Sequence, residues 1–230
     1  MHGFRGGLEG MDIAGSTQTQ AAATPAQAAE QAGSVRLAKP ADRPRLLRAL
    51  AEAFYDDPCM SWVFRDGDRR LDQLERIFRY FGERVWFDDD LTYTTDAVAG
   101  ASIWVAPERW HVGAFRELLM LPGMISSAGL RDLPRMLRFI ARMESEHPRQ
   151  PHYYLPVIGV APAWQGKGIG TALLAPILAR CDREGMPAYL EASSPRNRAC
   201  YERNGFTATG EMRVSDSPPL WPMWREPGGA

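Results

Sequence analysis

The chain has 230 residues, of which 45% are hydrophobic, 24% charged and 10% aromatic. This composition is typical of one well-packed domain and excludes collagen-like, disulfide-stapled and wholly disordered classes. The 27 basic and 28 acidic residues leave a net charge of -1, which provides no general attraction for nucleic acid or for an anionic membrane. No segment approaches the roughly 18 apolar residues that span a membrane, and no secretory signal opens the sequence, so we expect a soluble, cytoplasmic protein.

The N-terminal segment lacks large side chains. From Gly15 to Gly33 it contains only Gly, Ser, Thr, Gln, Ala, Pro and Glu, which cannot bury enough apolar surface to offset the entropy of ordering. We therefore predict a disordered tail over residues 1–33 and one folded domain over residues 34–230.

Strand and helix patterns alternate through the first half of this domain. Period-two and helical spacings of apolar residues distinguish the two kinds of element. The predicted strands are 34–38, 91–96 and 98–107, and the predicted helices are 40–54 and 68–86, with two more between Gly113 and His147 that break at Pro122, Gly123 and Pro134. The last helix carries an arginine face, but no aromatic side chains are interleaved with it, so we do not predict nucleic-acid binding.

The last third of the chain has the clearest signals. Strands are predicted at 152–160 and 187–193, and a glycine-rich turn leads into a helix that ends near Gly185. A short helix follows, with Ser194 as N-cap and Pro195 at its first position. Two final strands lie within 206–214 and 219–226. Strands dispersed among helices predict an α+β domain, a layered arrangement with helices on both faces of a mixed sheet.

Cysteine usage points away from a metal centre. Cys59, Cys181 and Cys200 are widely spaced and form no CxxC pair or Cys/His cluster. We expect reduced thiols and no metal.

The turn at 165–170, QGKGIG, is the strongest chemical signal. A glycine-rich turn between a strand and a helix lets several backbone N–H groups converge at the positive end of the helix dipole, where phosphate oxygens bind. A tight turn that binds nothing is the simpler interpretation of an isolated GxGxG. The GxxxxGK sequence followed by Ser or Thr that defines a Walker loop is absent. A dinucleotide fingerprint would follow its strand directly and place its third glycine one residue later. Glu191, about twenty residues on, leaves the nicotinamide alternative open.

VIGVAPAWQGKGIGTALL resembles motif A of the GNAT superfamily of acetyl-CoA-dependent N-acetyltransferases, with Gln165, Gly168 and Gly170 at its fixed positions. LEASSPRNRACYERNGF is similar to motif B of that superfamily, including Glu191, Asn197 and Tyr201. Within the superfamily, residues 35–226 are most similar to puromycin N-acetyltransferases. The resemblance implies a GNAT fold, acetyl-CoA as co-substrate and a small-molecule amine as acceptor, in a monomer or homodimer.

The resemblance also implies roles for particular residues. The cofactor-binding set would be the strand end, the turn and one asparagine: Ile158, Gly159, Val160, Gln165, Gly166, Lys167, Gly168, Ile169, Gly170, Thr171 and Asn197. A backbone N–H near Val160 would stabilise the oxyanion. Glu191 would accept the proton of the amine and Tyr201 would donate one to the departing thiolate. The simpler alternatives are a surface salt bridge or a structural anchor for Glu191, a core position for the tyrosine and helix capping by the asparagine.

The resulting hypothesis is direct acetyl transfer to a primary amine, because no histidine near Cys200 in the sequence would activate an acetyl-cysteine route. Two rivals stay open at this point. One is acetylation of a protein or peptide amine, and the other is a non-catalytic domain that senses acyl-CoA. Aromatic residues such as Trp104, Trp110, His111 and Tyr154 are compatible with an aromatic pocket, although core packing explains them equally well.

Overall fold

The computed structural model describes residues 30–87, 91–107, 109 and 114–228, with residues 114–120 described by their backbone only. One seven-stranded sheet has the order β1-β2-β3-β4-β5-β7-β6. Its strands are β1 (Val35–Leu37), β2 (Thr92–Thr95), β3 (Gly100–Val105), β4 (Tyr153–Val160), β5 (Ala188–Ala192), β6 (Thr207–Ala208) and β7 (Trp221–Arg225). All neighbouring strands pair antiparallel except β4 and β5, which are parallel. The sheet is mixed, as the sequence predicted.

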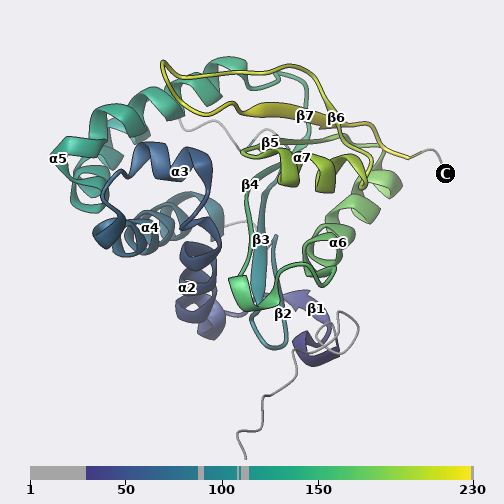
Figure 1. Cartoon of the computed structure of the whole chain (residues 1–230). Coiled ribbons are helices and arrows are strands. Elements are labelled where there is room, and N and C mark those ends of the chain that lie inside the picture. Colours follow the sequence, from purple (N-terminus) through teal and green to yellow (C-terminus); the bar gives the residue numbers. More distant parts are fainter. Residues whose placement is uncertain (1–29, 88–90, 108, 110–113, 229–230) are drawn as a thin grey trace, which may run out of the picture.

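Helices cover both faces of this sheet, which confirms the predicted α+β class (Figure 1). On one face lie α2 (Arg43–Phe54), α3 (Pro58–Val63), α4 (Gly67–Phe81) and the two-part helix α5 (Ala114–Glu146), whose apolar residues form one core with β3 and β4. On the other face, α6 (Ile169–Glu184) and α7 (Pro195–Glu202) pack over a second core. Short helical turns occupy η1 (Pro40–Asp42), η2 (Gly82–Trp86) and η4 (Pro162–Trp164).

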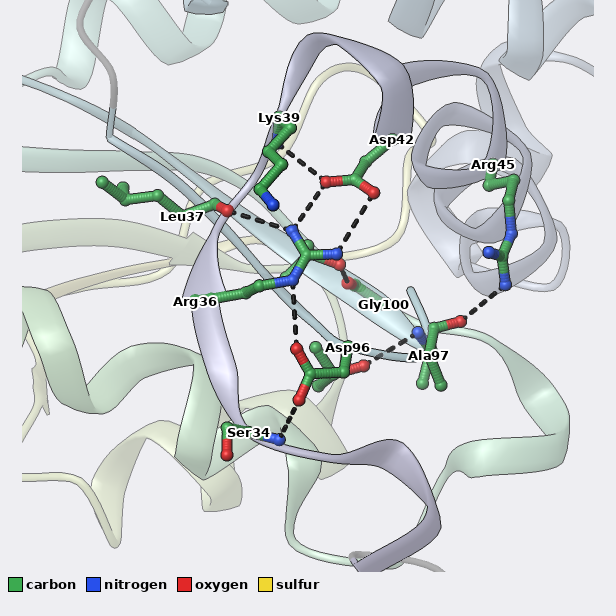
Figure 2. A network of polar contacts seen from close by, with 12 residues as sticks. Ser34, Arg36, Leu37, Lys39, Asp42, Arg45, Asp96, Ala97 and Gly100 are labelled. Carbon is green, nitrogen blue, oxygen red and sulfur yellow. Dashed lines mark hydrogen bonds and ion pairs between the residues drawn. The ribbon is translucent and has the colours of Figure 1, made fainter.

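Charged groups tie the edge strand β1 to the rest of the sheet. Figure 2 shows the Arg36 guanidinium between two carboxylates, with Nη1 2.7 Å from Asp42 Oδ2 and Nε 3.1 Å from Asp96 Oδ1. The hydrogen bond from Arg36 lowers the pKa of Asp42 to about 2. Asp96 also accepts from the Ser34 N–H at 2.8 Å, and Arg45 Nη2 donates to the Ala97 carbonyl at 2.8 Å. These hydrogen bonds and ion pairs connect β1 to the β2–β3 turn and to the N-terminal end of α2.

The described structure begins four residues before the predicted domain boundary. Glu30–Ala32 form a short helical turn, and the Ala32 side chain packs in a small core with Ala99, Ile169 and Leu173. The remainder of the predicted tail, residues 1–29, lies outside the described residues.

The predicted breaks at Pro122, Gly123 and Pro134 are wrong, because α5 continues through all three residues. Its two parts meet instead at Gly129, whose φ of 77° and ψ of 162° are accessible only to glycine. A proline removes one hydrogen bond and leaves the helical φ intact, whereas this backbone conformation redirects the chain.

Candidate functional site

The sheet opens between β4 and β5. Only Tyr153, Tyr154 and Leu155 of β4 pair with β5, and β4 then continues to Val160 without it. Pro156 follows the last paired residue and has no N–H to continue the ladder. The register of β4 against β3 also shifts between Ile103 and Val105, the β3 residues opposite this region. As a result, the backbone of β4 from Pro156 to Val160 has no strand paired with it on the β5 side and forms an open edge.

The open edge presents backbone groups that β3 does not use. Ala161 N–H donates to the Ala99 carbonyl at 2.9 Å, so that pair belongs to the hydrogen-bonded set of the β3–β4 ladder. Because the set alternates, Ile158 and Val160 direct their N–H and C=O groups away from β3 and toward the gap. Gln165 Nε2 donates to the Val160 carbonyl at 3.0 Å. The Val160 N–H therefore faces the gap as a donor.

The glycine-rich turn borders a cavity of about 320 Å³, which we call the loop cavity. Gly166 and Gly168 have φ values of 75° and 78°, and Gly168 is the N-cap of α6. A Cβ at Gly166, Gly168 or Gly170 would meet no atom within 4 Å, so these backbone segments face open space. This geometry is an N-terminal helix cradle of the kind that binds phosphate.

Nearly all predicted cofactor residues line the loop cavity. They are Ile158, Gly159, Val160, Gln165, Gly166, Gly168, Ile169, Gly170, Thr171 and Asn197, together with Tyr201. Lys167 is outside this set, because its ammonium donates to the Ala163 carbonyl at 2.9 Å and lies over the Trp164 ring. Arg196 and Arg203, which the sequence did not single out, add positive charge to the wall. The cavity thus combines backbone donors with two guanidinium groups.

Gly159 has an additional packing role. A Cβ there would lie 2.9 Å from Ala53 Cβ and 3.0 Å from Leu50 Cδ2. Helix α2 therefore approaches β4 as closely as it does only because residue 159 has no side chain. This contact places Ala53 and Phe54 in the wall of the loop cavity.

Asp57 connects α3 to Ser193 after β5, and it was not predicted from the sequence as a site residue. Its carboxylate caps α3 by accepting from the N–H groups of Cys59 and Met60, and it accepts a short hydrogen bond from Ser193. Asn197 Nδ2 donates to the same Ser193 hydroxyl at 3.3 Å, so this asparagine acts through its side chain rather than as a helix cap. Burial raises the pKa of Asp57. The Asp57-Pro58 pair is a typical N-cap signal that could have located α3.

A second cavity, of about 230 Å³, lies between β4 and the helices α2–α5, and we call it the apolar cavity. Aromatic, methionine and aliphatic side chains make most of its wall, and the ionisable groups in that wall are Glu144, His147 and Tyr154. Phe54 lines both cavities. Of the aromatic candidates from the sequence, Tyr154 lies here, Trp104 is fully buried in the core, and Trp110 and His111 fall outside the described residues.

Glu191 lies behind the apolar cavity rather than in the loop cavity. Its side chain is 3% exposed, and Tyr154 donates to its Oε2 at 3.1 Å. Burial raises the pKa of Glu191 to about 7, opposed by the hydroxyls of Tyr189 and Tyr154, which favour the charged form. A surface salt bridge is therefore excluded. A carboxyl with a pKa near neutrality is suited to accept a proton at physiological pH.

Tyr201 stands on the opposite side, in the wall of the loop cavity. It lies one helical turn after Asn197 on α7, and both side chains face that cavity. Burial raises the pKa of Tyr201, so the phenol keeps its proton at neutral pH. Cys200 also borders the loop cavity, and Cys59 and Cys181 are buried, with all three thiols free.

Among the described residues, no three His, Cys, Asp or Glu side chains gather into a metal-binding group. No helix in the same part of the chain is both long and apolar enough to cross a membrane.

Comparisons with known proteins agree with this geometry. The model of the acetyltransferase (GNAT) family matches residues 123–206, which include the turn, β5 and α7. An uncharacterized N-acetyltransferase of Schizosaccharomyces pombe is 29% identical over 202 residues, covering 81% of this chain and 80% of the relative.

Solved structures share the fold over most of this chain. A Corynebacterium glutamicum structure reported as histone acetyltransferase HPA2 and related acetyltransferase is 26% identical, with a TM-score of 0.65, over 86% of this chain and 97% of the other. Arylalkylamine N-acetyltransferase 2 from Aedes aegypti has a TM-score of 0.59 at 10% identity, over 84% of this chain and 98% of that one. The fold is the GNAT fold. The comparisons support an acyl-CoA-dependent acetyltransferase built on this fold.

Proposed function

We propose that this acetyltransferase moves an acetyl group from acetyl-CoA to a primary amine of a small molecule, with the acetyl-CoA in the loop cavity and the amine in the apolar cavity. One observation carries the proposal: the two cavities share Phe54, with the carboxyl of Glu191 behind one of them and the phenol of Tyr201 in the wall of the other. Reaction between ligands held on the two sides requires that arrangement.

Residues of the loop cavity fit the chemistry of the co-substrate. Its pyrophosphate requires backbone N–H donors, which the turn from Gly166 to Thr171 offers at the N-terminus of α6. Arg196 and Arg203 supply the positive charge that phosphate groups favour. Acetyl-CoA would supply an activated thioester carbonyl at the open edge of β4.

Three groups of this chain then stabilise the oxyanion, accept the proton of the amine and donate to the departing sulfur. The Val160 N–H donates to the carbonyl oxygen as negative charge develops on it, an interaction whose loss usually costs about a hundredfold or more in rate. Glu191 accepts the proton that the attacking amine must release. Tyr201 donates a hydrogen bond to the sulfur as the thiolate leaves, because its phenol is protonated at neutral pH.

The apolar cavity favours a particular acceptor. Its described wall contains no lysine or arginine, and its one carboxylate is Glu144. Such a wall favours an amine on an aromatic or apolar group and disfavours a substrate that carries a carboxylate or phosphate there. An aminonucleoside antibiotic such as puromycin, which offers a primary amine beside an aromatic ring, is the leading candidate.

A second candidate acceptor is a protein or peptide amine. The Corynebacterium glutamicum relative, 26% identical, is reported as a histone acetyltransferase. A peptide backbone would have to enter a cavity of about 230 Å³ with an apolar wall, which suits a single side chain better than a main chain.

Thiol release from acetyl-CoA tests these candidates. We would compare puromycin, phenylethylamine, phenylalanine and a lysine-containing peptide at equal concentration. The proposal expects release with puromycin or phenylethylamine and much less with phenylalanine, whose carboxylate the wall disfavours. Release with the peptide alone would support the second candidate. Stabilisation by acetyl-CoA without release from any amine would support an acyl-CoA sensor.

A pair of tryptophan variants separates the two cavities. Ile140→Trp places a large ring in the apolar cavity, whereas Leu130→Trp, on the same helix α5, adds the ring to a side chain that is 75% exposed. We expect Ile140→Trp to lose amine turnover and keep acetyl-CoA affinity, and Leu130→Trp to keep both. Equal turnover in the two variants would remove the apolar cavity from the reaction.

A further inference from the structure

Two buried histidines lie against Glu191. His147 follows the end of α5 and His152 precedes β4, and the two Nε2 atoms are 3.0 Å apart. His152 is 0% exposed, and the side chain of His147 is 3% exposed. His147 also lines the apolar cavity. A direct ring-to-ring hydrogen bond at this distance requires that one nitrogen carries the proton and the other does not.

The surroundings of His152 determine which nitrogen that is. His152 Nδ1 lies 2.6 Å from the Gln150 carbonyl oxygen, which only accepts, so Nδ1 carries a proton. Burial lowers the pKa of His152, which keeps the ring neutral and leaves its Nε2 as an acceptor. His147 Nε2 must therefore donate. The Gln150 carbonyl thus fixes the tautomer of both rings.

This tautomer leaves the remaining His147 nitrogen facing the carboxylate. His147 Nδ1 is 4.0 Å from Glu191 Oε1, an ion-pair distance, and this buried oxygen has no hydrogen-bond partner among the described residues. In a neutral ring whose Nε2 carries the proton, Nδ1 is an acceptor, as is an ionised carboxylate. The two atoms attract each other only when one proton resides on either of them.

We propose that His147 shares with Glu191 the proton taken from the acceptor amine, and that His152 positions His147 for this by fixing its tautomer. The inference rests on the proposed function. In the step, an N–H bond of the amine breaks, its electron pair stays on the attacking nitrogen, and the proton resides on the carboxylate or on His147 Nδ1, which lie at an ion-pair distance of 4.0 Å. Glu191 and His147 are the two proton sites, and His152 is a positioning residue.

Neighbouring groups favour this shared proton. The hydroxyl of Tyr154 from β4 donates to Glu191 Oε2 at 3.1 Å, whereas the buried hydroxyl of Tyr189 from β5 has no hydrogen-bond partner among the described residues. Burial raises the pKa of Tyr154 and of Tyr189, with smaller contributions from Glu144 and Glu146 of α5, and Glu146 is itself paired with Arg142 at 2.8 Å. Negative charge nearby favours retention of a proton by the Glu191–His147 pair.

Nitrogen-15 NMR of the histidine rings tests the tautomers in the protein without acetyl-CoA. The chain has four histidines, so His2→Asn and His111→Asn identify the signals of the buried pair. We expect the Nδ1–H tautomer for His152 and a protonated Nε2 in His147 from pH 6 to 9. A neutral His147 with its proton on Nδ1 would overturn the proposal. The spectrum requires no turnover, so this result is independent of whether the proposed function is correct.

The pH profile of kcat/KM with the accepted amine tests the shared proton. Removing one of two sites makes the proton bind less tightly, so His147→Gln should move the acid limb to lower pH by about one unit and lower kcat about tenfold. Tyr153→Phe is the control, because its hydroxyl bonds Glu184 rather than Glu191. A lower kcat with an unmoved limb would show a purely structural role for His147 and refute the proposal.

Discussion

Replacing Glu191 by glutamine should stabilise the fold at alkaline pH although it removes the proposed base. The folded protein holds the pKa of this carboxyl at about 7, against an ordinary value of 4.5. Between these pH values the folded state keeps a proton that the unfolded chain has released, so stability falls as pH rises through that window. Above it, the buried charge costs about 3 kcal/mol relative to the unfolded chain.

Glutamine has no such charge, and its carbonyl can accept the hydrogen bond that Tyr154 donates to Oε2 at 3.1 Å. We therefore expect the variant and the wild type to unfold with similar free energies at pH 5. At pH 8 the variant should be more stable by about 3 kcal/mol.

Urea unfolding at pH 5, 6, 7 and 8 measures this difference. Glu184→Gln is the matched control, because Arg180 and Tyr153 lower the pKa of that half-exposed carboxylate. Its loss should destabilise the protein slightly and by nearly the same amount from pH 5 to pH 8, since this carboxylate is charged in both the folded and the unfolded chain over that range. A difference between Glu191→Gln and the wild type that stayed constant from pH 5 to pH 8 would refute the reasoning.

Three further outcomes are expected. Gly168→Ala and Gly185→Ala both place a side chain at positive φ, so each should lose about 1–2 kcal/mol of stability. Only Gly168→Ala, at the loop cavity, should weaken acetyl-CoA binding by tenfold or more in calorimetry. Equal acetyl-CoA affinities of the two variants would contradict this prediction. Tyr201→Phe should lower kcat about a hundredfold with little change in acetyl-CoA affinity; wild-type turnover would remove the donor role. Gly159→Ala should cost about 1–3 kcal/mol in thermal unfolding by separating α2 from β4, and adding Ala53→Gly should recover part of it if the 2.9 Å approach is the cause.

The parts of the site that the sequence predicts depend on local signals. The turn at Gly168 and the α7 cap at Ser194 are fixed by residues within a few positions of each other, and both occur as predicted. Phosphate cradles and helix caps require only neighbouring backbone groups, so a short pattern specifies them. The prediction that Lys167 binds the cofactor is not met by its position, because its place in the motif does not determine where its long side chain lies.

The parts that the sequence does not predict depend on tertiary contacts. His147 and His152 flank a loop before β4, and nothing in their spacing indicates that Glu191, about forty residues later, lies beside them. The pKa of Glu191 is likewise raised by its burial in the folded protein. Neither the packing of a helix over a strand nor the resulting desolvation can be derived from periodicity.

The early end of the β4–β5 pairing accounts both for the free backbone donors of β4 and for the position of the Glu191 carboxylate. Leu155 and Leu190 are the last paired residues of the two parallel strands, so Pro156 and Glu191 come directly after the point where pairing ends. Beyond it, the β4 backbone up to Val160 keeps unused donors, which a thioester requires, while the carboxylate on β5 lies just past the last pair. A regular β4–β5 ladder would consume those donors and close the gap. The register shift opposite Ile103 and the missing N–H of Pro156 are therefore as necessary to the proposed site as the glycine-rich turn.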